Sequence, residues 1–288
     1  MTGQLNADGD FYLLRLVPPV LRARGFRLYT AGKTKADGKC RLVDLWQNGG
    51  AAILGHTPPL QLRELKNTAE RGLYAPFPHF LEERYRKALA GIFPGRYFRL
   101  YASPPPELPA LMSAGVAALW RPFLSVKAPL NVADNAVLVP VLPGIQGWRV
   151  TPEHALPLGL CVLALTDNAT PPLPPGDFLP PVLLAVAARG VHDMVATATG
   201  KPAPVFRRIA KVVRNEKSAW RQCGRYLLYD GVETWAAMFR RFLDAGFLLP
   251  PVPCQPVILP AELSPGEEAK LAQLLAAEFT GRGSNDRD

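Results

Sequence analysis

The stretch that decides the fold begins Gly25-Phe-Arg-Leu-Tyr29 and continues through Asp37-Gly38-Lys39, Leu42-Val-Asp-Leu-Trp46 and Gly49-Gly-Ala-Ala-Ile-Leu-Gly-His56. Two short apolar runs flank the Asp37-Gly38 pair, which is typical of a β-hairpin. The glycines at the end mark positions where the backbone must turn or pack closely. The stretch therefore predicts a hairpin followed by a tight, glycine-rich loop.

Composition indicates a globular chain with a substantial core. The 288 residues are 48% hydrophobic, enough for one large or two small domains. We find no run that approaches the ~20 apolar residues of a membrane-spanning helix, and the polar start (residues 6–10) is not a signal peptide. The four cysteines, Cys40, Cys161, Cys223 and Cys254, show no metal-binding spacing. We expect reduced thiols, no metal site, no membrane partner and a cytoplasmic location.

The net charge of +9 is concentrated in residues 207–225. This segment contains Arg207, Arg208 and Lys211, for which we consider an anion-binding role. Most charge runs are solvated helix faces. A footprint for nucleic acid or for a small anionic ligand is the alternative.

Apolar periodicity divides the rest of the chain into helices and strands. It predicts helices over 60–70, 80–91, 106–124, 178–195, 203–220, 234–245 and 265–279, and strands over 97–102, 136–142, 160–165, 226–229 and 257–259. Residues 11–24 are expected to form two short helical pieces around a proline kink, and residues 281–288 a disordered tail. Two of the strands are apolar on both faces, which suits a parallel sheet covered by helices.

The order of these features resembles the small domain of class III aminotransferases, which are fold type I pyridoxal-phosphate (PLP) enzymes. The resemblance rests on Leu54-Gly55-His56 followed by Pro58, and on a C-terminal helix, a Gly-Phe-Leu-Leu-Pro turn, a strand and a final helix. It implies an α/β fold with a pruned, mostly parallel central sheet and an α+β small domain built from both termini. The implied parts are 1–96 and 205–280 for the small domain, 97–204 for a reduced large domain, and 281–288 for the tail. Gly55, His56 and His79 would lie in an entrance or dimer loop.

In that family a turn rich in Ser and Gly holds the coenzyme phosphate, an Asp pairs with the ring nitrogen and a Lys forms the Schiff base. The matching positions here are Ser103, Asp167 and Lys201. The turn after residue 102 reads Ser-Pro-Pro-Pro-Glu, and proline has no N–H to donate to a phosphate. Lys201 has neither the preceding strand nor the following glycines that the family shows.

These observations favour a degenerate aminotransferase-like protein without transaminase activity, with a binding or structural role and with no cofactor. The resemblance implies a homodimer. A PLP enzyme with a rearranged site at Asp167 and Lys201 is the alternative. An anion or nucleic-acid binder acting through residues 207–225 is the second alternative, although we do not expect nucleic acid as the main partner.

Overall fold

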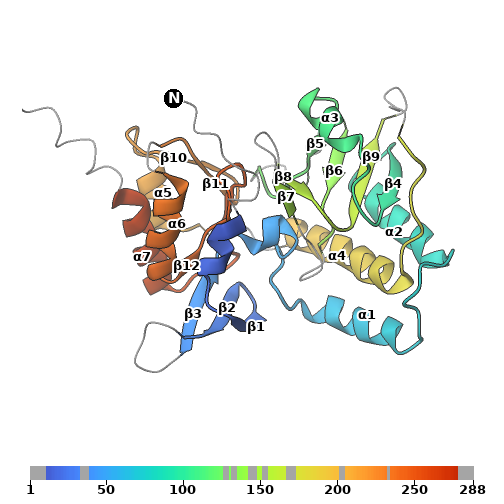
Figure 1. The fold of residues 1–288 in the computed structure, drawn as a ribbon, viewed down its shortest axis with the longest axis horizontal. Helices are drawn as coiled ribbons and strands as arrows, with labels where there is room; N and C mark the ends of the chain where they lie inside the picture. Colours follow the sequence, from blue (N-terminus) through green and yellow to red (C-terminus); the bar gives the residue numbers. More distant parts are fainter. Residues whose placement is uncertain are drawn as a thin grey trace, which may run out of the picture. The chain divides into compact units, whose positions relative to one another are not determined.

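The computed structural model describes residues 11–32, 39–125, 130, 135–141, 148–150, 155–166, 173–200, 205–231 and 234–277 (Figure 1). The chain forms two compact units. The first joins the two ends of the chain, Met1–Gly49 and Pro202–Asp288, and the second is the continuous middle, Gly50–Lys201. The domain boundaries suggested by the sequence, at residues 96, 204 and 280, stay a prediction.

A four-stranded sheet in the order β1-β2-β3-β12 lies in the first unit. Its strands are β1 (Val20–Arg24), β2 (Arg27–Ala31), β3 (Lys39–Asp44) and β12 (Phe247–Leu248). Gly25 has a φ of 56°, which glycine adopts without strain, and it turns the chain between β1 and β2. The antiparallel pairing of β2 with β3 confirms the predicted hairpin. Because β12 pairs parallel with β3, a C-terminal strand completes a sheet that the N-terminal part begins.

The first unit also contains a three-stranded sheet and three helices packed around one core. The strands follow the order β10 (Trp220–Cys223), β11 (Tyr226–Tyr229) and β13 (Val257–Ile258). The helices are α5 (Arg207–Val213), α6 (Trp235–Asp244) and α7 (Pro265–Ala276), and a 3-10 turn, η1 (Phe11–Leu16), precedes β1. Ile209, Phe239 and Leu271 place the inner faces of the three helices in the shared core.

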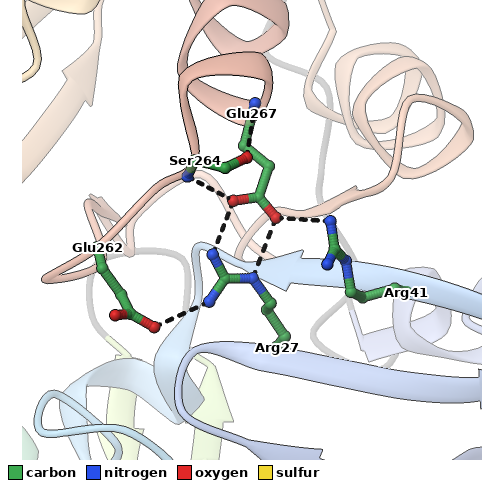
Figure 2. A network of polar contacts seen from close by, with 5 residues as sticks. All are labelled: Arg27, Arg41, Glu262, Ser264 and Glu267. Carbon is green, nitrogen blue, oxygen red and sulfur yellow. Dashed lines mark hydrogen bonds and ion pairs between the residues drawn. The ribbon is translucent and has the colours of Figure 1, made fainter.

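A polar network ties the two chain ends of the first unit together (Figure 2). Ser264 and Glu267 form a reciprocal capping box at the start of α7. The Glu267 carboxylate also accepts hydrogen bonds from Nε and NH2 of Arg27 on β2, at 3.0 and 2.7 Å. Arg41 on β3 lies 3.1 Å from the same carboxylate, and Glu262 lies 3.0 Å from Arg27. One helix-capping residue therefore anchors the C-terminal helix to the N-terminal sheet.

The second unit is built on a four-stranded sheet in the order β4-β9-β6-β5. Its strands are β4 (Tyr97–Tyr101), β9 (Cys161–Leu165), β6 (Ala136–Leu138) and β5 (Ala118–Leu119); β7 (Trp148–Val150) and β8 (Ala155–Pro157) form a separate pair. The helices are α1 (Pro59–Ala69), α2 (Phe80–Ala90), α3 (Leu108–Ser113) and α4 (Pro181–Thr199). β9 is buried along its whole length, and α4 packs alongside α1 and α2 (Figure 1).

The prediction of a mostly parallel sheet is wrong for the described strands. β9 is antiparallel to both of its neighbours, β4 and β6, and β5 and β6 pair in parallel. A strand that is covered on both faces has the same apolar sequence whichever way its neighbour runs. The apolar composition of β9 therefore predicted its burial correctly, but it could not predict whether the neighbouring strands run parallel or antiparallel.

Three helix predictions are also corrected. The helix expected over 106–124 ends at Ser113, because Gly115 has a φ of 68° and Leu111 O accepts the N–H groups of Val116 and Ala117. The long basic helix expected over 203–220 is the short α5, followed by a turn and β10. The two helical pieces expected within 11–24 are η1 and the strand β1.

By length and composition α4 is apolar enough to cross a membrane, which differs from the expectation that no run approaches such a helix. Half of its apolar window is buried inside the structure. Leu184, Ala185 and Ala188 lie on the buried side. Core helices of globular proteins meet the same criterion, so α4 is weak evidence for a membrane span.

Candidate functional site

The loop after β4 is where the resemblance places a phosphate-binding turn. β4 ends at Tyr101, and α3 does not begin until Leu108. Pro104, Pro105 and Pro106 have no N–H, and the Leu108 N–H donates to Pro105 O at 3.0 Å. α3 has only six residues, so its aligned peptide dipoles are few.

A carboxylate from a segment far along the chain accepts a hydrogen bond from the first N–H group of this loop. Asp177 Oδ2 accepts the N–H of Ala102 at 2.9 Å, and the Asp177 N–H donates to Leu100 O at 2.7 Å. Both bonds fix Asp177 against the end of β4. Gly176 permits the approach, because a Cβ there would lie 2.7 Å from Leu100 O.

Two side chains of β4 hold the same distant segment by its carbonyl groups. Arg99 NH1 donates to Leu173 O at 2.6 Å, and Tyr101 OH donates to Pro174 O at 2.9 Å. Burial raises the pKa of Tyr101, so its hydroxyl keeps the proton that it donates. The segment thus covers the exposed edge of β4, which would otherwise present unpaired backbone groups.

The described residues of this loop do not fit a coenzyme phosphate. Such a phosphate needs several N–H groups that converge on one point. The prolines supply none, and the amides of Ala102 and Leu108 are already bonded. Ser103 and Glu107 have backbone N–H groups, but the Asp177 carboxylate, bonded to the adjacent Ala102 N–H, would repel a second anion at the start of this loop.

Ser103 is the one predicted cofactor residue that lies within the described part of the chain, where it is exposed on this loop. Asp167 and Lys201 lie outside the described residues. Asp177, which no sequence pattern singled out, stands in a Pro-Pro-Gly-Asp run. The glycine before Asp177 was the only local signal of this contact, because Asp177 and Ala102 are 75 residues apart in the sequence.

The predicted loop residues Gly55, His56 and His79 flank helices of the second unit. Gly55 is buried with a φ of 93° just before α1, as expected for a tight turn, and His56 is partly buried there. His79 caps α2, since its Nδ1 accepts the N–H of Leu81 at 3.2 Å. A groove of about 400 Å³ is lined by Phe80, Glu83, Arg84, Lys87, Ala88 and His192.

A left-handed turn, η2 (Gln47–Gly50), follows β3. Gln47 and Asn48 have φ values of 50° and 48°, a conformation that costs a residue other than glycine about 1–2 kcal/mol. Asp44 Oδ1 accepts the N–H groups of Trp46 and Gln47, and Gln47 Nε2 donates to Ile258 O at 3.1 Å. Gly49-Gly50 indicated this turn in the sequence. The strained backbone begins two residues earlier, at Gln47, which no sequence pattern predicted.

The three predicted anion-binding residues, Arg207, Arg208 and Lys211, are all exposed on α5. They belong to the first unit, whereas Ser103 belongs to the second. No group of three or more potential metal-ligating side chains occurs among the described residues, which leaves the part of the chain outside them untested.

Comparisons with known proteins bear on the fold. No protein-family model matches the chain. An uncharacterized protein of Treponema pallidum (strain Nichols) is 26% identical over 292 residues, covering 86% of this chain and 91% of that protein.

Among solved structures, ornithine delta-aminotransferase of Plasmodium falciparum superimposes with a TM-score of 0.59 at 10% identity, covering 96% of this chain and 99% of the enzyme. A transaminase with PLP bound gives a TM-score of 0.57 at 12% identity, covering 96% of this chain and 98% of the transaminase. These likenesses show that the chain has an α/β fold like that of PLP-dependent aminotransferases.

Proposed function

We propose that this chain is a degenerate relative of class III aminotransferases that keeps their fold, has lost transamination and serves a binding or structural role. The observation that carries the proposal is the loop after β4. There three prolines replace amide donors, and Asp177 binds the Ala102 N–H. The sequence around Leu54-Gly55-His56 supports the class III assignment.

The energetic argument rests on charged hydrogen bonds. A bond to a charged group contributes about 1.5–3 kcal/mol, so removing three donors weakens phosphate binding by at least ~4 kcal/mol. Since 1.4 kcal/mol is a factor of ten, the affinity falls roughly 1000-fold. The Asp177 carboxylate adds repulsion. We therefore expect no tightly held PLP.

The test is incubation with PLP, borohydride reduction and mass spectrometry of the peptides. We expect no stoichiometric adduct at Lys201 and no absorbance band that depends on it. Lys211→Ala is the matched control, because Lys211 is an exposed lysine of the first unit and reports random labelling. A stoichiometric adduct that disappears in Lys201→Ala and persists in Lys211→Ala would overturn the proposal.

A working PLP enzyme is the second candidate, and the fold shared with a transaminase with PLP bound favours it. In that case Lys201 would supply the amine and Asp167 would pair with the ring nitrogen, which the chemistry of the coenzyme requires. The same experiment separates the candidates, because a Schiff-base lysine gives a reducible adduct before any substrate is added.

A homodimer is the assembly we propose. Six large apolar side chains are exposed between residues 60 and 80, namely Leu60, Leu62, Leu65, Tyr74, Phe77 and Phe80. We propose that these six side chains, which lie within 21 residues of one another in the sequence, form the dimer contact, because contiguous exposed apolar surface is typical of protein-binding sites. Light scattering should give twice the chain mass, and Phe77→Ser with Phe80→Ser should shift it to the monomer. Tyr97→Ser, at a similarly exposed aromatic, should leave the mass unchanged; a monomeric native chain would contradict the proposal.

A further inference from the structure

Residues 207–225 carry most of the net charge of the chain. They contain seven basic residues and one acidic residue, a net charge of +6 against +9 for all 288 residues. Arg225 is buried, with Nε donating to Leu259 O, so it belongs to the core. The other six basic side chains are exposed.

The helix α5 is amphipathic, with its basic side chains exposed and its apolar side chains packed against the core. Ile209 is fully buried, and Phe206, Val212 and Val213 pack against the same core. Arg207, Lys211 and Arg214 are spaced i, i+4 and i+7, which places them on one face of the helix. At 1.5 Å per residue the row is about 10 Å long.

The edge strand β10 extends the charged surface beyond the helix. β10 is at the end of its sheet and contacts α5. Arg221 is exposed on it, 3.8 Å from the exposed Asp230, and Lys217 is exposed on the turn between the two elements. Arg208 is exposed at the start of α5, where its backbone N–H donates to Glu268. We name Arg207, Arg208, Lys211, Arg214, Lys217 and Arg221 the basic surface.

Most of this charge is available to a partner. Among the described residues, the side chains of Arg207, Arg208, Lys211, Arg214 and Lys217 form no ion pair with a carboxylate. Five cations within one short helix and its following turn outnumber the Glu216 and Glu268 carboxylates there. A polyanion that binds them relieves their mutual repulsion and releases its own counterions.

The geometry points to a nucleic-acid phosphate backbone, bound without sequence preference, as the partner of the basic surface. A membrane surface is disfavoured because the apolar side of α5 is in the protein core and cannot insert into lipid. Arginine predominates in the surface, and its planar guanidinium suits phosphate. Trp220 and Tyr226 nearby are buried, so neither can stack on a base. This inference is independent of the proposed loss of transamination.

The test is the binding of a labelled 20-base-pair duplex DNA and of its separate strand, measured by fluorescence anisotropy between 50 and 200 mM salt. For five phosphate contacts on the duplex, the slope of log K against log salt is roughly −4.5, so affinity falls about 500-fold across this range. The variant Arg207→Gln/Lys211→Gln/Arg214→Gln should reduce the slope by about three and weaken binding at 50 mM salt at least tenfold. The single variant Lys211→Gln should reduce the slope by about one.

The matched control is Arg63→Gln/Lys66→Gln/Arg71→Gln, which removes the same charge from exposed positions of the second unit. It should leave the slope nearly unchanged, and circular dichroism should show that both triple variants are folded. The inference fails if the native chain binds neither probe, if binding has no salt dependence, or if the control loses as much affinity as the α5 variant. It also fails if phosphatidylserine vesicles are bound and the DNA probes are not.

Discussion

Glu267→Gln should destabilise the first unit in a way that depends on pH. Its carboxylate accepts two bonds from Arg27 and the N–H of Ser264 at 2.8 Å, and Arg41 lies beside it (Figure 2). Burial by itself raises the pKa of Glu267, but the Arg27 and Ser264 bonds and the Arg27 charge more than offset this, so the pKa falls to about 2. The same pairing raises the pKa of Arg27.

The magnitude follows from linkage between ionisation and folding. A pKa unit is worth ~1.4 kcal/mol, so a fall from 4.5 to about 2 gives an upper bound of about 3.4 kcal/mol. Solvent screening at the rim of the network, where Arg41 and Glu262 are more than half exposed, reduces this to about 2 kcal/mol. Because the folded pKa is depressed, the stabilisation is complete above pH ~4.5 and is lost as the pH falls through about 2.

The assay is urea unfolding followed by circular dichroism at pH 7, 4 and 2.5. The difference in unfolding free energy between the native chain and Glu267→Gln should be about 2 kcal/mol at pH 7 and should shrink at each lower pH. Glu262→Gln removes the same charge from an exposed partner of Arg27 and should cost under ~0.5 kcal/mol. A difference that stays constant with pH, or an equal loss in Glu262→Gln, would refute the reasoning.

Three further outcomes follow from close packing and burial. Gly176→Ala should destabilise the second unit by at least ~2 kcal/mol in thermal unfolding, because the new Cβ would lie 2.7 Å from Leu100 O. Gly266→Ala should instead stabilise the first unit by about 0.4–1 kcal/mol, since no atom lies within 4 Å of its added Cβ and its backbone is helical; a loss of stability would contradict this. Exposed Cys254 should react with a thiol reagent at pH 8 before unfolding. Burial raises the pKa of Cys161 to about 12, so Cys161 should stay unlabelled until urea unfolds the chain, and early labelling there would count against its burial.

The sequence predicted those elements whose determinants are local. The apolar spacing in 265–279 predicted α7, which spans Pro265–Ala276 and begins at the capping box of Ser264 and Glu267. The apolar spacing in 80–91 predicted α2, which spans Phe80–Ala90. In both cases a few neighbouring residues decide the conformation, so no distant contact was needed.

The predictions failed where turn chemistry interrupted an apolar pattern. Met112, Val116 and Leu119 have helical spacing, but Gly115 turns the chain before the pattern ends. After α5, Asn215 Oδ1 accepts the N–H of Lys217, which forms a local turn in place of further helix. Periodicity averages over such single residues, and for that reason both helices were predicted too long.

The direction of β9 bears most directly on function. Tyr97 pairs with Leu165 and Tyr101 with Cys161, so β4 ends beside the start of β9. Ser103 therefore follows β4 at one end of this strand pair, and Thr166 follows β9 at the other end. The two ends of β4, Tyr97 and Tyr101, are separated by about 13 Å at ~3.4 Å per residue. Strand direction, which an apolar run does not encode, therefore decides which loops of this sheet lie together, and it separates the loop after β4 from Thr166.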